Sequence, residues 1–134
     1  MKHLFTGFAC LLITCCFISC KKEKECPVPD APSMVGFWQG KYGGSTVYPT
    51  SGYAALFRSN GTVRIYDGTD TATAGKAEGT YNVSGNTVTA TYNYSPSIQY
   101  SISATVDSKF TFLEGTYGSG TNTTNGGRWF MNKK

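Results

Sequence analysis

The strongest constraint on the fold of this chain is an alternation of apolar and polar side chains with a period of two residues. In Thr87–Tyr94, valine, alanine and tyrosine fall on one face, and threonine and asparagine fall on the other. Tyr100–Val106 repeats the alternation. This period is typical of half-buried antiparallel strands, and residues such as Thr, Tyr and Val favour strands as well. Because no stretch after the N-terminal apolar run has the 3.6-residue period of a helix, we predict an all-β domain at 35–134.

Clusters of Gly, Asn, Asp, Ser and Pro separate the alternating segments, and such clusters mark turns. The segments predict eight strands, at roughly 36–42, 53–58, 62–66, 77–83, 87–94, 99–106, 110–117 and 127–133. Short connections favour pairing in sequence order, and eight such strands can close into an up-and-down antiparallel barrel that has no free edge. A two-sheet sandwich is the rival arrangement. The absence of long crossover connections favours the barrel.

The first nineteen residues predict a secretory signal rather than part of the fold. Lys2 and His3 give a positive start, and the apolar run Leu4–Ile18 is too short for a comfortable membrane span. The run continues into Ser19 and Cys20, and this ending resembles the lipobox of bacterial lipoproteins. The resemblance implies that the signal is cut after Ser19 and that Cys20 is diacylated and anchored in a lipid membrane. A rival site is "LITCC" at Leu12–Cys16.

The residues after this cysteine predict a tether to the membrane. Two or more acyl chains hold a membrane stably. Lys21 follows the cysteine, and by resemblance to enterobacterial sorting this residue implies the outer membrane of the cell envelope. Residues 20–34 are charged and then proline-rich, as in a solvated linker. Cys26 is the one other cysteine left after signal cleavage, and it lies in this linker.

The predicted domain lacks the residues that many enzymes need. All cysteines lie at or before position 26, and the one histidine is His3. The domain therefore has no disulfide, no Ser-His-Asp or Cys-His nucleophile and no ordinary zinc site. Its acids are Asp67, Asp70, Glu78, Asp107 and Glu114. Asp67 and Asp70 lie in "YDGTD", a sequence that predicts a turn, with a weak calcium site as the alternative. We expect no catalytic residue, metal or cofactor, so the protein is not expected to be an enzyme.

The charges of the domain are few and scattered. From residue 34 onward there are eight basic and five acidic residues, which gives a net charge of +3. Nucleic-acid binding needs basic residues clustered on one face. We therefore expect no nucleic-acid partner, and we expect a monomer.

Gly36, Phe37 and Trp38 open the first predicted strand, and the last segment reads "GGRWFMNKK". This pattern resembles the calycin signature of lipocalins, fatty-acid-binding proteins and avidins, and the whole domain resembles small lipocalin-like domains of bacterial lipoproteins. In lipocalins the tryptophan lies across the closed end of the barrel, and an arginine of the last strand packs on it. The resemblance implies that Trp38 and Arg128 form this pair here. A guanidinium stacked on an indole is worth about 0.5–2 kcal/mol.

The same resemblance implies that a small apolar or amphipathic ligand binds in the barrel mouth. The side chains expected to line this site are Tyr42, Phe57, Tyr81, Tyr92, Tyr100 and Tyr117. An ordinary ligand site needs a cavity of about 300 Å³ or more. Bulky side chains can instead fill an eight-stranded interior. The second hypothesis is therefore a filled barrel that binds a protein or glycan through the Gly/Thr-rich loops 43–52, 67–76 and 118–127.

Two local features leave alternatives open. "EGTY" occurs at Glu78–Tyr81 and at Glu114–Tyr117, and we favour repeated hairpin geometry over a paired Tyr/Glu site. In "KFTFLEGTY" the alternation changes phase between Phe112 and Leu113. We favour a bulge in this strand over two outward phenylalanines, Phe110 and Phe112, which would suggest an interaction patch.

Overall fold

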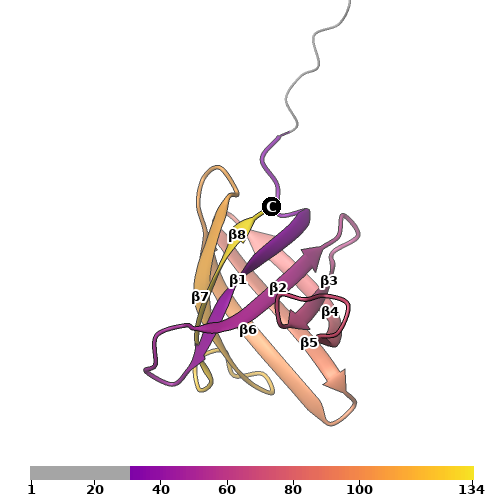
Figure 1. Cartoon of the computed structure of the whole chain (residues 1–134). Helices are drawn as coiled ribbons and strands as arrows, with labels where there is room; N and C mark the ends of the chain where they lie inside the picture. Colours follow the sequence, from indigo (N-terminus) through magenta and orange to yellow (C-terminus); the bar gives the residue numbers. More distant parts are fainter. Residues whose placement is uncertain (1–30) are drawn as a thin grey trace, which may run out of the picture.

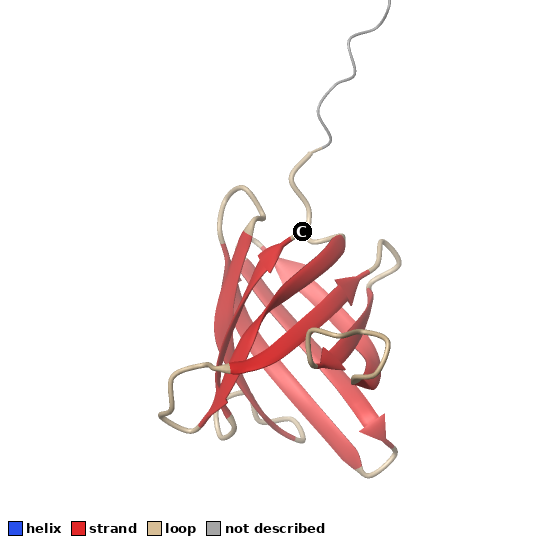
Figure 2. Cartoon of the chain, viewed as in Figure 1, coloured by secondary structure: helices blue, strands red, loops and turns tan. Residues whose placement is uncertain are grey.

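Eight antiparallel strands pair in sequence order and close on themselves in the computed structural model, which describes residues 31–134 (Figure 1). The strands are β1 (Gly36–Gly44), β2 (Ser51–Phe57), β3 (Thr62–Asp67), β4 (Gly75–Ser84), β5 (Thr87–Ser95), β6 (Ile98–Val106), β7 (Phe112–Ser119) and β8 (Gly127–Lys133). The described residues contain strands and loops without a helix (Figure 2). Each predicted strand agrees with an observed one to within two residues at either end.

The all-β barrel predicted from the alternation is confirmed, and the sandwich is excluded because β1 pairs with β8. Within residues 31–134 no helix is long and apolar enough to cross a membrane. The predicted signal, Cys20 and most of the predicted tether lie outside the described residues. The last tether residue, Met34, is only 3% exposed, so the folded unit begins slightly before the predicted boundary.

The seam between β1 and β8 closes the barrel through seven residue pairs, from Trp38 opposite Lys133 to Gly44 opposite Gly127. Gly40 lies at the middle of this seam, opposite Met131. A Cβ atom at Gly40 would lie 1.8 Å from the carbonyl oxygen of Phe130 and 2.7 Å from the Cα of Met131. Only glycine permits the two strands to approach this closely.

Inward side chains alternate with outward ones along each strand and fill the barrel. The largest fully buried side chains are Trp38, Trp129, Phe57, Ile65, Ile102, Leu113, Met131, Val63, Val88 and Val106. At about 25 cal/mol per Å² of apolar surface removed from water, this core is the main stabilising contribution in a domain without disulfides.

The two ends of the barrel differ. In an up-and-down barrel, the connections after odd-numbered strands share one end, and those after even-numbered strands share the other. Residues 31–34 reach β1 at the second end, beside the C-terminus (Figure 1). The three Gly/Thr-rich loops follow β1, β3 and β7, so they surround the first end. We call the end where the described chain enters β1 and leaves β8 the closed end, and the other the open end.

The "EGTY" repeat reflects strand geometry. At Gly79 a Cβ atom would lie 2.0 Å from a backbone oxygen of β5, and at Gly115 it would lie 2.1 Å from a backbone oxygen of β6. Both glycines therefore permit the same kind of close strand approach. Tyr81 lies toward the closed end of β4 and Tyr117 toward the open end of β7. The alternative of a paired Tyr/Glu site is wrong, because the two copies face opposite ends of the barrel.

The predicted bulge in "KFTFLEGTY" is wrong. Phe110 belongs to the turn before β7, has a φ of 55° and packs against the core from there. The Asp107 carboxylate accepts backbone N–H groups from Thr111 at 2.6 Å and Phe112 at 2.9 Å, which fixes this turn. The pairing of β7 with β6 then runs without a register shift. The alternation changes phase because a turn ends at Phe112, whose side chain faces outward and is 36% exposed.

Candidate functional site

Trp38 lies at the closed end and is completely buried. Its indole N–H donates a hydrogen bond to the backbone carbonyl of Met34, 2.9 Å away. Its ring packs edge-to-face on Phe57, with 6.2 Å between the ring centroids. The segment that leads into β1 therefore covers the tryptophan and shuts this end of the barrel.

The predicted contact between Arg128 and Trp38 is wrong. Arg128 pairs with Gly43 in the β1–β8 register, five residues along β1 from Trp38, and its side chain is exposed. Its neighbours Gly127 and Trp129 take the inward positions of β8, so Arg128 is out of phase with the interior. The cation near the indole is Lys133, whose Nζ lies 5.9 Å from the ring centroid. Lys133 also donates a hydrogen bond to the carbonyl of Ser33 at 2.7 Å.

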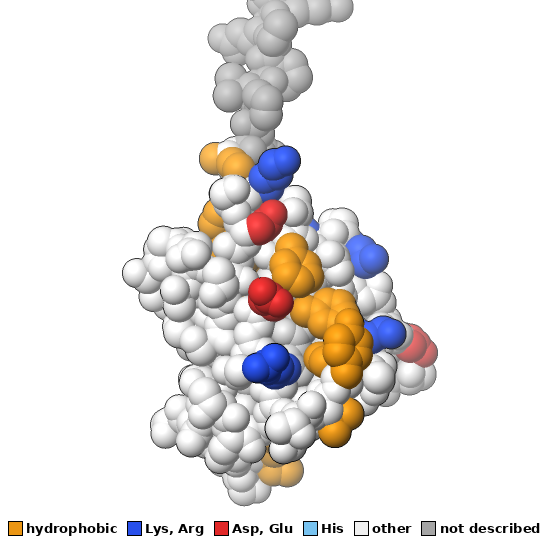
Figure 3. All heavy atoms as spheres, turned by 90° about the vertical axis from the view of Figure 1, so that its left-hand side faces the viewer, with side chains coloured by type: hydrophobic (Ala, Val, Ile, Leu, Met, Phe, Trp, Pro, Cys, Tyr) orange, Lys and Arg blue, Asp and Glu red, His pale blue; other side chains and the backbone are white. Residues whose placement is uncertain are grey.

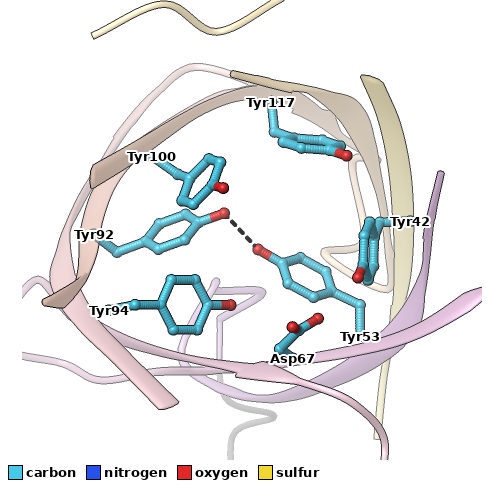
Figure 4. A pocket seen from close by; sticks show the side chains of 7 residues that line it. All are labelled: Tyr42, Tyr53, Asp67, Tyr92, Tyr94, Tyr100 and Tyr117. Atoms are coloured by element: carbon cyan, nitrogen blue, oxygen red, sulfur yellow. Dashed lines mark hydrogen bonds between the residues drawn. The ribbon is translucent and has the colours of Figure 1, made fainter. Parts of the chain in front are cut away.

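The open end holds a small cavity lined almost entirely by tyrosines (Figure 4). We call it the tyrosine cup. Its volume is about 130 Å³, and its lining residues are Tyr42, Tyr53, Asp67, Tyr92, Tyr94, Tyr100 and Tyr117. They come from β1, β2, β3, β5, β6 and β7, so the closed sheet itself holds the cup in shape.

A hydrogen bond across the barrel forms the floor of the cup. The hydroxyl oxygens of Tyr53 and Tyr92 lie 2.7 Å apart, and the two residues are 6% and 3% exposed. Trp129 packs against Tyr53 with 6.3 Å between the ring centroids. The interior beneath the cup is therefore filled by aromatic and aliphatic side chains.

The tyrosine rings contact one another around the wall of the cup. Tyr42 packs edge-to-face on Tyr117, with centroids 6.0 Å apart, and at an angle of 59° on Tyr53. On the other side, Tyr100 lies nearly parallel to Tyr92 and nearly perpendicular to Tyr94, each at 6.1 Å. Aromatic pairs in these arrangements contribute about 0.5–1.5 kcal/mol beyond the area that they bury. The wall is thus both a packing layer and a set of ring faces and hydroxyl groups directed at one small space.

Burial raises the pKa of three tyrosines of the cup. It raises the pKa of Tyr92 to about 12 and the pKa of Tyr53 well above its usual value. Burial also raises the pKa of Tyr94. Loss of solvation disfavours the charged phenolate, and these side chains carry neutral hydroxyl groups near neutral pH.

Asp67 supplies the one carboxylate of the cup. It is the last residue of β3 and lies in phase with the inward residues Val63 and Ile65. Figure 4 shows its carboxylate at the rim, beside Tyr53 and Tyr94. Burial and then the Asp67 carboxylate raise the pKa of Tyr42. Asp67 is therefore part of the cup wall and not only of the turn that the sequence indicated.

Four of the six side chains predicted to line the mouth do line the cup, namely Tyr42, Tyr92, Tyr100 and Tyr117. The other two do not. Phe57 packs between Trp38 and Tyr81 at the closed end, and the Tyr81 hydroxyl donates a hydrogen bond to the Arg58 carbonyl at 2.9 Å. The other lining residues are Tyr53, Tyr94 and Asp67. Alternation places Tyr94 on the inward face with Tyr92, but this residue was not predicted to line the ligand site. All three residues stand two positions from apolar inward residues in their strands, and this spacing was the available sign that they face the interior.

A second hollow lies on the outside of the barrel, between the β1–β2 loop and the outer faces of β7 and β8. We call it the outer groove, and its volume is about 870 Å³. Val47 and Tyr48 on its loop side are 62% and 75% exposed, and Phe112 and Phe130 line its other side. Figure 3 shows a band of hydrophobic side chains down this side of the molecule, flanked by charged ones.

No group of three or more His, Cys, Asp or Glu side chains in the described part of the chain is arranged to hold a metal ion. The protein-family models, the curated proteins and the solved structures contain no match to this chain.

Proposed function

We propose that this protein is a non-enzymatic binding protein of the bacterial cell envelope, a lipoprotein whose lipocalin-like barrel holds a small amphipathic ligand in the tyrosine cup. The observation that carries the proposal is the cup itself. It is open at one end, shut below by the Tyr53–Tyr92 hydrogen bond, and lined by ring faces, hydroxyl groups and one carboxylate. A concave apolar site with a few convergent polar groups is the usual form of a small-molecule site.

The cup is smaller than the cavity of about 300 Å³ or more that we expected of an ordinary ligand site, and this size limits the ligand. Its 130 Å³ equals the space of roughly four water molecules at about 30 Å³ each, and sites for drug-sized ligands are about 300–1,000 Å³. A fatty acid or another long apolar molecule does not fit inside. The proposed ligand is therefore a small molecule, or the compact head group of a longer one whose remainder projects from the mouth.

The placement of the two ends agrees with membrane anchoring through Cys20. The described chain reaches the barrel through residues 31–34 at the closed end, and the cup opens at the opposite end. A tether attached at the closed end leaves the mouth accessible. The proposed location is the outer membrane, on the grounds of the Ser19–Cys20 pattern and Lys21.

Changing Cys20 to alanine tests the anchor. We expect the variant to lose membrane association and to fold as the parent does, because Cys20 precedes the barrel. The measurement is membrane fractionation of the producing cells together with the thermal unfolding of the purified protein. The matched control is Cys26→Ala, which also removes one linker thiol and should remain with the membrane. Retention of the Cys20→Ala variant in the membrane after signal removal would contradict the lipoprotein proposal.

Narrowing the cup tests the ligand site. Tyr100 stacks on Tyr92 and lines the cavity, so Tyr100→Trp places a larger ring in the same space. The probes are short-chain alcohols, amines and carboxylic acids, titrated against the full chain and followed by saturation-transfer NMR. We expect at least one of these classes to bind the parent, and Tyr100→Trp to weaken that binding by about fivefold or more, roughly 1 kcal/mol.

The matched control is Phe112→Trp, which also introduces the larger indole ring, but on the exposed face of β7, and should leave binding unchanged. If no probe binds, or if Phe112→Trp weakens binding and Tyr100→Trp does not, the cup is not the ligand site.

The second hypothesis, a filled barrel that binds a protein or glycan through its loops, is supported by the outer groove. Val47 and Tyr48 project from the β1–β2 loop beside it. We favour the cup because side chains from six strands enclose it, whereas one loop and the faces of two strands border the groove.

A further inference from the structure

The lining of the tyrosine cup has charge of one sign, carried by the exposed residue at the end of β3. Asp67 is its only charged lining residue, and neither a lysine nor an arginine lines the cavity. Arg128 and Lys41 belong to the strands near the mouth, but both occupy outward positions and are exposed. An anionic ligand in the cup would therefore face a carboxylate and find no positive partner within the lining.

The neutral tyrosines add ring faces to this negative charge. A tyrosine keeps its proton at physiological pH and is an uncharged π surface, and burial raises the pKa of Tyr92 further, to about 12. The face of an aromatic ring carries partial negative charge, and it attracts a cation that lies within about 6 Å of the ring centroid.

The angles between the rings suit an enclosed cation. Tyr42 and Tyr117 meet at 83°, and Tyr94 and Tyr100 meet at 86°. All four rings line the same small cavity, so one compact guest there can contact several of them. Aromatic cages of this kind recognise quaternary and methylated ammonium groups.

We propose that the tyrosine cup selects a small organic cation with a methylated ammonium group over neutral and anionic molecules of the same shape. This inference rests on the proposed function and names the ligand class of that same site. The methyl groups pack on the tyrosine rings, and the positive charge lies near the Asp67 carboxylate. The cup volume of about 130 Å³ accommodates a compact head group of this kind.

The test compares three probes of one shape in the full chain at low ionic strength. The probes are choline, its uncharged tert-butyl analogue in which carbon replaces the nitrogen, and the matching tert-butyl carboxylate. Binding is followed by amide chemical shifts in two-dimensional NMR. We expect choline to bind at least about tenfold more tightly than the neutral analogue, and the carboxylate to bind more weakly than either.

Two charge-removing variants separate the role of Asp67 from the overall charge of the protein. Asp67→Asn should weaken choline binding at least about threefold and leave the neutral analogue unchanged. Glu114→Gln removes the same charge from an exposed outward position on β7 and should leave both affinities unchanged.

The failures of the two proposals are distinguishable. If the neutral analogue or the carboxylate binds as tightly as choline, or if Asp67→Asn leaves choline binding unchanged, the selection for organic cations is wrong and the cup remains a binding site. If none of the three probes binds and the alcohol, amine and acid probes fail as well, the proposed function itself is wrong.

Discussion

Changing Gly40 to alanine is expected to destabilise the barrel by about 3 kcal/mol or more, which is a large share of the roughly 5–15 kcal/mol that holds a typical domain folded. The added Cβ would lie 1.8 Å from the Phe130 carbonyl oxygen and 2.7 Å from the Met131 Cα. Both atoms belong to the backbone of β8, so no change of rotamer relieves the overlap. The seam between the first and last strands must separate instead, and this seam closes the barrel.

The measurement is equilibrium unfolding in urea, with the thermal midpoint as a second reading. For a domain of this size, a loss of 3 kcal/mol lowers the midpoint by about 12 °C or more. Gly44→Ala is the matched control. It lies in the same strand, and the nearest atom to its built Cβ is 3.9 Å away, so the variant should behave nearly as the parent does. Equal effects at the two positions would show that loss of a glycine in β1, rather than close strand approach at Gly40, is responsible.

Most of the fold could be predicted from the sequence because alternation and turn residues act locally. The alternation in Thr87–Tyr94 and Tyr100–Val106 indicates which side chains face inward, and the short connections leave few ways to pair the strands. The start of β7 was less predictable. The phase change before Leu113 arises from a turn that the Asp107 carboxylate fixes, and this turn lacks the glycine that marks other turns of the chain.

The contact between Arg128 and Trp38 was predicted from family resemblance. The alternation of inward and outward residues in the last strand would have corrected it. Trp129 and Met131 are the apolar residues of the last strand and define its inward positions. Arg128 is out of phase with them, and Lys133 is in phase. The position of Lys133 opposite Trp38, however, depends on the register between two strands that are far apart in sequence. Alternation does not specify that register.

The candidate site could be predicted only in part, because alternation does not specify strand register. Alternation identifies Tyr42, Tyr92 and Tyr100 as inward residues, but it does not tell which end of the barrel each one occupies. Tyr81 is likewise inward and belongs to the closed end. Asp67 was interpreted through its turn-forming neighbours, although the phase of Val63 and Ile65 already directs it inward. Depth along the barrel axis is set by strand register and strand direction together.

Changing Trp38 to alanine is expected to destabilise the protein by about 3–5 kcal/mol, the usual cost of removing a large buried aromatic side chain. Trp38 is completely buried, packs on Phe57 and donates its indole N–H to the Met34 carbonyl. The variant leaves a cavity at the closed end and a carbonyl group without its donor. It also removes the surface on which the buried Met34 covers the barrel, so the chain at Met34 should become more accessible to protease.

Comparison with Trp38→Phe separates packing from hydrogen bonding. Phenylalanine keeps an aromatic ring in the core and loses the N–H donor, so we expect a cost of about 1–3 kcal/mol. The order of stability should be parent, then Trp38→Phe, then Trp38→Ala, measured by urea unfolding and by limited proteolysis at Met34. Lys133→Met keeps the aliphatic part of the side chain and removes the cation, and it should cost only about 0.5–1 kcal/mol. If Lys133→Met were as damaging as Trp38→Ala, the lysine contact rather than burial of the indole would hold the closed end shut.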